Sequence, residues 1–598
     1  MESSRSFALR VLPLLLVCLS SGWPLGAQDA DEVRSLLDAR VGGIERLQVP
    51  ENAEDLPQPL LPDETVDPRF AITAEKVRLG KLLFFDPVRS TDIRPEFGGV
   101  VETTKTASCG SCHIGQAASK AGTLTAVGVG GEGRHETSAT GLQRIDRTMI
   151  EGLGDILPTS VEMIDAEGNV VASGRFDAVD APGRVSPSCI GFAYNNRLLW
   201  GGEAGEVNPE GYPAQEDIVR LASMAHRMAS SDFSHLQDLA VYRKLFEDAF
   251  PEVDPQNLDD LINLDTQVRA IAAFLRTAIT RDTPWDRFLA GDDPALTPRQ
   301  LRGAWLFSAS VEDGGASCIS CHSGPALNKV LGDEKGLLVE ENFQNVGASE
   351  HPLVALARET LEDADFHDTG RIGVTGEPSY DYAFKSPTLR QVKDAAPYFH
   401  GGHAETLHDV VEYFNAGIAA GELAAEAGSL SPLFTQPRGD GRAGLGLSEE
   451  DLDALVDFLE NGLYDPAFVV HDASSPTRTF ELNMDDLTYS DELKALGAVD
   501  GWLPTFMPNG FNDEKSRGQL LFLRGDGNSD NNVDLADAIF TLSFLFWGGF
   551  RPHPMEAADA NGDGRVDVTD ATFVVGYLFL GDRAPPFPFP EIGQNLAQ

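Results

Sequence analysis

Two five-residue segments constrain the fold of this 598-residue chain more than any other feature. Residues 109–113 and 318–322 both read Cys-x-x-Cys-His. The six residues concerned are Cys109, Cys112, His113, Cys318, Cys321 and His322. Two thiols one helical turn apart can add to the two vinyl groups on one edge of a haem, and the next imidazole can then bind the iron. The spacing therefore predicts two covalently attached c-type haems, with the two histidines as proximal ligands.

Other interpretations of the cysteine pairs remain open at this stage. Each pair could form a disulfide in an exported protein, or half of a zinc site. Zinc is a poor fit, because the pairs lie about 200 residues apart and a zinc site does not need histidine directly after the second cysteine. Cys189 stands alone and is expected to be a buried thiol rather than a reactive one.

The N-terminal segment resembles an export signal. Arg5 and Arg10 precede a short apolar run over residues 11–19, and Ala27 ends a plausible cleavage site, so residues 1–27 are expected to be a signal peptide. The run is shorter than the roughly 20 residues that span a bilayer. An uncleaved anchor, or a lipoprotein acylated at Cys18, is the alternative. The mature chain is expected to be periplasmic, extracellular or cell-surface, and not transmembrane.

The charge balance excludes some partners. Lys and Arg number 46 against 93 Asp and Glu, a formal net charge of −47. Such a surface repels nucleic acid and anionic lipid, and it favours cations or basic proteins.

The two haem motifs have similar surroundings, which suggests a duplicated, mainly α-helical domain. Residues 79–86 and 302–307 both predict an amphipathic helix that ends in aromatic residues and leads by a loop into the motif. Thr297 and Pro298 give the second helix a clear start. Apolar residues at helical spacing over 258–279 predict a core helix.

On these residues the chain resembles the bacterial di-haem cytochrome c peroxidases and the related methylamine-utilisation di-haem enzymes, from about residue 75 to 465. Besides the haem motifs, the resemblance rests on five blocks: residues 79–86, 321–325, 368–371 with 384–390, 396–402, and the predicted closing helix 448–459.

The resemblance implies two cytochrome c-like domains whose haems face one interface. The N-terminal haem, with His113 as proximal ligand, would meet peroxide. The C-terminal haem, with His322, would pass it electrons from a small donor protein, either a c-type cytochrome or a copper protein. A calcium ion commonly lies between the two domains in this family, but its ligands cannot be assigned here.

The chain departs from the family at the peroxide site. Peroxide cleavage needs a distal acid/base, which in this family is usually a Glu shortly after a Gln-Phe-Trp-Asp-Gly-Arg block. The matching residues 198–203 keep Trp200 but lose the Gln, Asp and Arg. Glu203, Glu206 and Glu210 are the candidate catalytic bases, but each is expected to be a surface carboxylate instead.

The distal iron ligands are also altered. His135, beside a glycine-rich loop, is the candidate for the first iron, or else a solvated loop histidine. The family's Met or Tyr for the second iron corresponds to Phe414, which is expected to pack in the core. Tyr413 and His403 are the remaining candidates, so the second iron would be His/Tyr, His/His or five-coordinate. His400 is expected to be structural.

The last 75 residues contain a repeated acidic loop. The candidate calcium ligands are Asp526, Asn528, Asp530, Asn532, Asp534 and Asp537, repeated 33 residues later as Asp559, Asn561, Asp563, Arg565, Asp567 and Asp570. This spacing follows EF-hand logic, with a backbone carbonyl at position 7, and predicts two bound calcium ions. The pair resembles dockerin modules, which implies a docking partner. A calcium-stabilised cap on its own chain is the alternative.

The predicted organisation has six parts. They are the signal peptide 1–27, an extension 28–70, a first cytochrome c-like domain 71–290, a second 291–470, a linker 471–517, and a paired EF-hand domain with a Pro-rich tail, 518–598. The predicted function is reduction of hydrogen peroxide. The alternatives are a di-haem oxidase or oxygenase acting on another substrate, a protein side chain included, and a non-catalytic electron carrier.

Overall fold

The structure is a computed structural model, and it describes most of residues 29–469 and much of 521–594. The larger described ranges are 29–85, 184–205, 211–225, 233–333, 338–351, 366–436, 443–469, 521–527, 533–547, 555–562 and 565–581, with shorter pieces around 109–120, 144–182, 354–358 and 583–594. The predicted signal peptide, His135 and the predicted linker lie outside the described residues.

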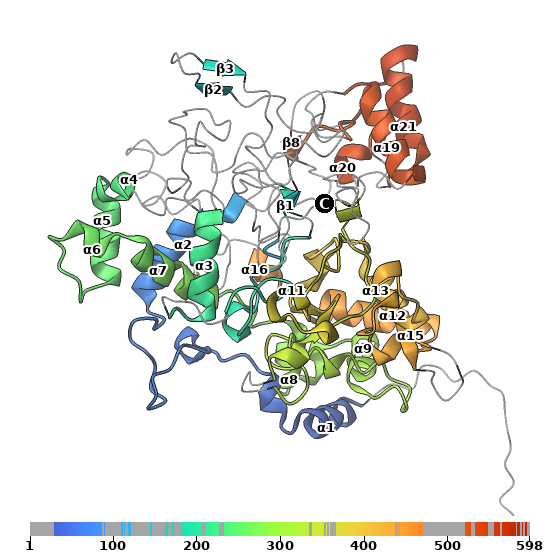
Figure 1. The fold of residues 1–598 in the computed structure, drawn as a ribbon. Coiled ribbons are helices and arrows are strands. Elements are labelled where there is room, and N and C mark those ends of the chain that lie inside the picture. Colours follow the sequence, from blue (N-terminus) through green and yellow to red (C-terminus); the bar gives the residue numbers. More distant parts are fainter. Residues whose placement is uncertain are drawn as a thin grey trace, which may run out of the picture.

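A first helical lobe lies on the left of Figure 1. Its helices are α2 (Ala74–Phe85), α3 (Ala214–Ala225), α4 (Ser234–Gln237), α5 (Ala240–Ala249), α6 (Leu258–Leu261) and α7 (Leu264–Arg276). Helices α2 and α3 both pack against α7, around one apolar cluster that includes Leu79, Ile271 and Phe274. Phe468 of the short α16 (Pro466–Val469) also packs there, so the chain returns to this lobe after the second one.

A second helical lobe lies at the lower right of Figure 1. Its helices are α8 (Pro284–Leu289), α9 (Pro298–Ser308), α11 (Ile372–Thr375), α12 (Leu407–Ala416), α13 (Glu422–Glu426), α14 (Pro432–Thr435) and α15 (Glu449–Asp457). Helix α1 (Ala30–Val41), from the N-terminal extension, packs against α9 and adds Val33 and Leu37 to this lobe's core. The core also contains Trp285 of α8 and Phe458, which follows α15.

The two lobes use glycine in the same way where their main helices cross. A side chain at Gly80 of α2 would meet the carbonyl oxygen of Ala270 in α7 at 1.9 Å, and one at Gly303 of α9 would meet that of Ala454 in α15 at 2.1 Å. Only glycine permits so close a backbone approach. The equivalence supports the predicted duplication.

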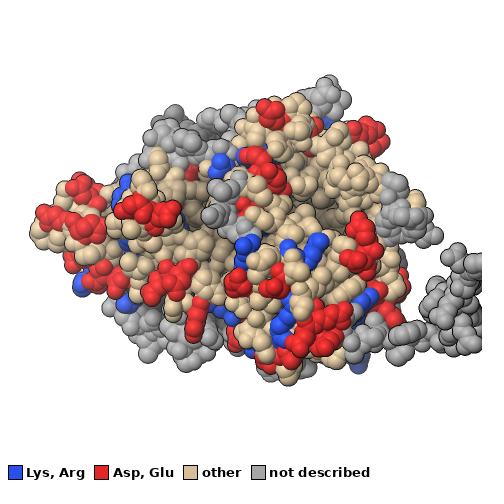
Figure 2. All heavy atoms as spheres, turned by 90° about the horizontal axis from the view of Figure 1, so that it is seen from below, with Lys and Arg blue, Asp and Glu red and all other residues tan. Residues whose placement is uncertain are grey.

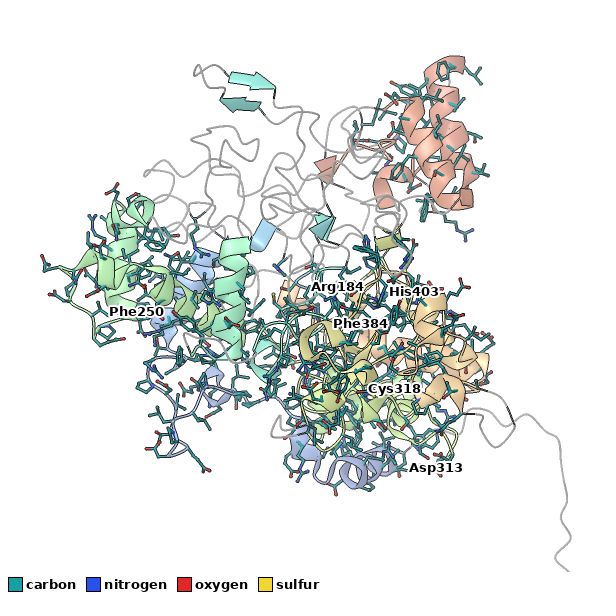
Figure 3. The ribbon with its side chains drawn as sticks, in the orientation of Figure 1. Arg184, Phe250, Asp313, Cys318, Phe384 and His403 are labelled. Atoms are coloured by element: carbon teal, nitrogen blue, oxygen red, sulfur yellow. The ribbon has the colours of Figure 1, made fainter. Side chains whose placement is uncertain are left out.

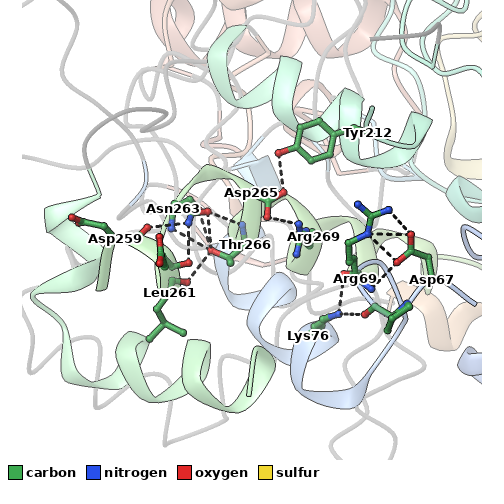
Figure 4. A network of polar contacts seen from close by, with 12 residues as sticks. Asp67, Arg69, Lys76, Tyr212, Asp259, Leu261, Asn263, Asp265, Thr266 and Arg269 are labelled. Carbon is green, nitrogen blue, oxygen red and sulfur yellow. Dashed lines mark hydrogen bonds and ion pairs between the residues drawn. The ribbon is translucent and has the colours of Figure 1, made fainter. Parts of the chain in front are cut away.

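Most helix predictions are confirmed, and one is wrong. Thr297 caps α9 with Pro298 at its first position, and Ser448 caps α15. The single helix predicted over 258–279 is divided into α6 and α7, because Asn263 adopts an extended backbone and caps α7. Figure 4 shows this cap together with Asp265, which binds Arg269 at 2.6 Å and accepts a hydrogen bond from Tyr212 at 2.8 Å.

The remaining elements are short. In the described part of the chain the strands form four antiparallel pairs, β1 (Arg144–Ile145) with β4 (Ala181–Pro182), β2 (Glu162–Ile164) with β3 (Val170–Ala172), β5 (Phe343–Gln344) with β6 (Phe384–Lys385), and β7 (Leu521–Phe522) with β8 (Gly593–Gln594). Short 3₁₀ turns include η5 (Cys109–Ser111) and η11 (Cys318–Ser320) in the haem motifs, and η9 (Phe192–Tyr194) and η14 (Val392–Asp394) shortly before residues 198–204 and 398–404.

The C-terminal unit is a small helical pair. Helix α19 (Leu535–Trp547) packs against α21 (Val568–Val575), which continues as the π-helical turn η16 (Gly576–Leu580), and the short α20 (Met555–Ala558) lies between them in the chain. Ala538, Ala571 and Val574 form its core. In the part of the chain that the structure describes, no helix has both the length and the apolar character needed to cross a bilayer.

Candidate haem sites and calcium loops

The second haem motif forms a tight turn after α9. Cys318 begins η11, and the backbone N–H of His322 donates to the Cys318 carbonyl at 2.9 Å. Nδ1 of His322 donates to the carbonyl oxygen of Leu327 at 3.1 Å. A neutral imidazole protonated at Nδ1 keeps the Nε2 lone pair for a metal. The turn therefore fits an iron ligand held in one orientation.

The first haem motif has the same geometry. The N–H of His113 donates to the Cys109 carbonyl at 3.0 Å, and its Nδ1 donates to the carbonyl oxygen of Ser119 at 3.0 Å. Cys189 lies beside this ring, with Sγ 3.4 Å from Nδ1. Cys189 is only partly buried, against the first lobe's apolar cluster, and its lack of reactivity stays a prediction.

The cysteines are available for thioether bonds. None of the described cysteines, Cys109, Cys189, Cys318 and Cys321, forms a disulfide, and Cys112 lies outside the described residues. The described residues contain no group of three or more His, Cys, Asp or Glu placed to hold a metal ion. The unpaired cysteines and the oriented imidazoles fit c-type haem, whose iron supplies the redox chemistry when the group is bound.

Two loops of equal length meet where the lobes join. In residues 198–204 and 398–404 the first and last residues pair in antiparallel fashion, and the second residue is left-handed, with φ 68° at Leu199 and 65° at Phe399. We call these the first and second interface loops. They are bound by reciprocal backbone hydrogen bonds, from Val185 N to His400 O (2.7 Å) and from Lys385 N to Trp200 O (2.9 Å). The interface is therefore close to two-fold symmetric in its backbone.

Glu203 of the first interface loop lies in a buried ion pair, so the surface position expected for it is wrong. Arg184 donates to Glu203 at 2.5 Å and to both oxygens of Asp368 at 2.6 and 2.7 Å, and the other Glu203 oxygen accepts from Gly201 N at 3.0 Å. Burial opposes the charge on Asp368, but the guanidinium outweighs it and keeps the pKa of Asp368 below its usual range. Glu206 and Glu210 lie outside the described residues.

Aromatic rings fill the same interface. The Trp200 and His400 ring centroids are 6.4 Å apart, and His400 stacks on Phe384 at 3.5 Å. Figure 3 shows Phe384 beside Arg184, whose guanidinium carbon lies 5.4 Å from its ring. Burial lowers the pKa of His400 to about 3, so this imidazole is neutral at physiological pH. His400 is thus buried at the interface.

The candidate ligands on the distal side of the second haem have different partners. The Tyr413 hydroxyl donates to the Val346 carbonyl at 2.7 Å. His403 stacks on Phe399 at 4.2 Å, and both of its ring nitrogens are buried without a hydrogen-bond partner among the described residues. Phe414 packs against the apolar cluster, as predicted.

The two acidic C-terminal loops have matching backbone geometry. Asp537 and Asp570 each accept from the backbone N–H three residues earlier, at 2.8 and 2.9 Å. Both are buried, as are Asp526 and Asp559. Buried carboxylates at EF-hand spacing are a donor set for calcium. Asn528, Asp530, Asn532 and Asp563 lie outside the described residues, while Asp534, Asn561, Arg565 and Asp567 lie within them.

Comparisons with known proteins agree with this geometry. The sequence profile of di-haem cytochrome c peroxidases matches residues 74–294, and that of the dockerin type I domain matches 524–579. A cytochrome c peroxidase of Denitromonas iodatirespirans is 30% identical over 295 residues, covering 46% of this chain and 68% of the relative. The cytochrome c peroxidase of Escherichia coli is 26% identical over 409 residues, covering 68% of this chain and 62% of the relative.

Two further proteins are similar. The methylamine utilization protein MauG of Methylophilus methylotrophus is 27% identical over 282 residues, covering 47% of this chain and 68% of the relative. The crystal structure of a MauG-like protein associated with microbial copper homeostasis superposes with a TM-score of 0.46 and 22% identity, covering 72% of this chain and 98% of that one.

The duplicated helical lobes and haem motifs therefore define a di-haem c-type cytochrome, of the oxidoreductase class formed by the peroxidases and MauG. The chain belongs to the di-haem cytochrome c peroxidase family, and it ends in a dockerin type I domain.

Proposed function

We propose that this protein is an exported di-haem cytochrome that reduces hydrogen peroxide with electrons from a small redox protein. The observation that carries the proposal is the matching geometry of His113 and His322, each oriented by a loop carbonyl and each next to unpaired cysteines. Two electrons and two protons convert one peroxide into two waters. Two haems in one chain can supply both electrons without waiting for a second donor.

We propose that electrons cross at the two interface loops. Trp200, His400 and Phe384 form a run of aromatic rings between the lobes, with centroid separations of 6.4 and 3.5 Å. Arg184, paired with Glu203 and Asp368, holds one end of this run in place. In this proposal these residues orient the path and exclude water from it.

The distal assignments follow from which side chains are already engaged. Both carboxylate oxygens of Glu203 are hydrogen-bonded, so we propose Glu206 or Glu210 as the distal acid/base. Tyr413 already donates to a backbone carbonyl, whereas both nitrogens of His403 lack a partner among the described residues. We therefore propose His403 as the distal ligand of the second iron. For the first iron we propose His135, on its position beside the glycine-rich loop in the sequence.

The surface charge favours a basic electron donor. The net charge is −47, and Figure 2 shows clusters of acidic side chains, with fewer basic ones, on a face that is otherwise mostly uncharged. A positive donor would be attracted over a Debye length of about 8 Å at physiological salt. We expect the apparent second-order rate with a basic cytochrome to fall steeply as ionic strength rises.

The test combines spectroscopy with turnover. Electron paramagnetic resonance of the oxidised, haem-loaded protein is recorded before and after one-electron reduction, and peroxide consumption is followed with a reduced donor. A high-spin signal, present at once or after reduction, together with turnover supports a peroxidase. Two low-spin signals that never change, without turnover, would contradict it and leave an electron carrier.

Loss of the family's Gln, Asp and Arg favours a second candidate function. In this alternative the same haems oxidise a different substrate, such as a protein side chain, with peroxide as oxidant. Open iron with slow peroxide consumption, but peroxide-dependent oxidation of an added protein, would favour this alternative.

We propose that the dockerin domain attaches the enzyme to a cohesin-type partner outside the cytoplasm. Apolar side chains are exposed on this unit at Leu535, Ile539, Val568, Phe579 and Leu580. Large exposed apolar residues gathered on one small domain are typical of a protein interface. Calcium-dependent binding to an immobilised cohesin would support the docking role, whereas calcium-dependent stabilisation of the haem lobes without cohesin binding would indicate a cap on its own chain.

A further inference from the structure

A lysine of the first lobe donates into a backbone loop of the second. Lys120 lies seven residues after His113 and is 5% exposed. Its amine donates to the carbonyl oxygens of Ala395 and Pro397 at 2.5 and 2.8 Å. No carboxylate forms an ion pair with it among the described residues. The amine therefore joins the lobes through neutral oxygens alone.

A lysine of the second lobe donates hydrogen bonds to the first lobe. Lys385, on β6, donates to the side-chain oxygen of Asn195 at 3.2 Å and to the carbonyl oxygen of Arg197 at 3.1 Å. Both acceptors belong to the first lobe, just before the first interface loop. Here too the amine binds neutral oxygens, and its residue is partly buried.

The acceptors occupy equivalent positions in the two lobes, although Asn195 accepts with its side-chain oxygen and Ala395 with its backbone carbonyl. Asn195 and Arg197 lie 200 residues before Ala395 and Pro397, the same offset that separates the two interface loops. Each lobe thus offers a pair of oxygens three to five residues before its Trp200 or His400, and each pair receives an amine from the other lobe. The donors are not equivalent, since one follows a haem motif and the other lies on a strand.

A third lysine shows that a lysine seven residues after a haem motif does not always donate to the other lobe. Lys329 lies seven residues after His322, as Lys120 does after His113, yet its amine lies 3.6 Å from Asp333 in its own lobe. Lys329 is therefore a control for the loss of a partly buried lysine that does not bridge the lobes.

We propose that Lys120 and Lys385, the interlobe lysines, are positioning residues that hold the two haem lobes in register by reciprocal amine-to-oxygen hydrogen bonds. The oxygen pairs that they occupy lie between the haem domains, where a calcium ion is expected from the family resemblance. The connection is therefore made by this chain's own amines rather than by a bound ion at these oxygens. The proposal does not depend on which substrate the haems act upon.

The test uses the backbone amides that cross the interface. Val185 N–H and Lys385 N–H each donate to the other lobe, so their hydrogen exchange reports lobe separation directly. In the haem-loaded full chain, Lys120→Met should speed exchange in peptides around Val185, and Lys385→Met in those around residue 385, by about tenfold or more. Peptides from α7 and α15 should keep their protection in both variants.

Two controls separate this role from general damage. Lys329→Met should leave exchange at both crossing amides unchanged. Chelation of calcium should unfold the C-terminal calcium loops but leave the crossing amides protected. If a methionine variant does not fold, Lys120→Gln and Lys385→Gln, which keep an N–H donor, are measured instead and should lose less protection. Unchanged exchange in the double variant, or loss of protection on chelation, would overturn the proposal.

Discussion

The first and second interface loops have the same backbone and different side chains. Residues 198–204 and 398–404 share a closing pair, a left-handed second residue and a left-handed glycine, at Gly202 and Gly402. At the third position one loop has Trp200 and the other His400, and at the sixth one has Glu203 and the other His403.

This combination of a shared backbone with different side chains shows which features the interface requires. The backbone of each loop is fixed by the hydrogen bonds that it exchanges with the other lobe, so a change in backbone shape on one side would break contacts on both. The side chains face different surroundings and could diverge. Glu203 pairs with Arg184, while the His403 nitrogens have no hydrogen-bond partner among the described residues and the ring stacks on Phe399. The shared backbone is thus structural, and the chemical differences between the two loops lie in their side chains.

The largest loss of activity is expected from removing one of the two haems. Cys318→Ala with Cys321→Ala removes both thioether positions of the second lobe. We expect one covalent haem per chain by mass spectrometry, and donor-dependent peroxide turnover lower by at least about 100-fold, because electrons would lose their entry point. Unchanged turnover with one haem would show that the second haem is not needed to pass electrons to the first.

Breaking the ion pair at the first loop should cost the most stability of any single change at the interface. Arg184→Met leaves Glu203 and Asp368, whose side chains are 2% and 4% exposed, without their guanidinium. Loss of one partner from a buried pair typically costs about 3–5 kcal/mol. Arg287→Met, which removes an exposed pair with Asp282, is the control and should cost about 0–1 kcal/mol. Denaturant unfolding measures both, and equal values would contradict the assignment.

The interlobe lysines give the interface a pH dependence. Burial lowers the pKa of Lys120 to about 7, and burial, with Lys329 nearby and Glu203 opposing it, lowers that of Lys385 to about 7. The unfolded chain therefore binds more protons than the folded chain above pH 7. Stability should rise between pH 7 and about 10, by at most about 1.4 kcal/mol per pH unit per lysine.

The measurement of this slope is thermal or denaturant unfolding across that range. Lys120→Met with Lys385→Met should flatten the rise, because neither group is then left to titrate. A rise of the same steepness in the double variant would assign it to other groups.

Local sequence patterns predicted part of this architecture, and contacts between distant residues account for the rest. Thr297, Pro298 and Ser448 act on neighbouring backbone, so their caps could be read from the sequence. The break at Asn263 was missed because apolar spacing continues through it. The burial of Glu203 could not be predicted either, since its partner Arg184 lies 19 positions earlier in the chain, and Asp368, which binds the same guanidinium, lies 184 positions after Arg184.

The smallest change in stability is expected from substitutions at the third position of the two interface loops. Trp200 donates from Nε1 to the Val185 carbonyl at 2.6 Å, whereas Nε2 of His400 is buried without a partner among the described residues. Trp200→Phe should therefore lose one hydrogen bond, about 1 kcal/mol, and leave a buried carbonyl unsatisfied. His400→Phe replaces an unpartnered polar atom with carbon on the same Phe384 ring, and should change stability by less than about 0.5 kcal/mol. Denaturant unfolding of the two variants decides the point, because a larger loss at His400 than at Trp200 would show that the imidazole has a polar partner essential to the interface.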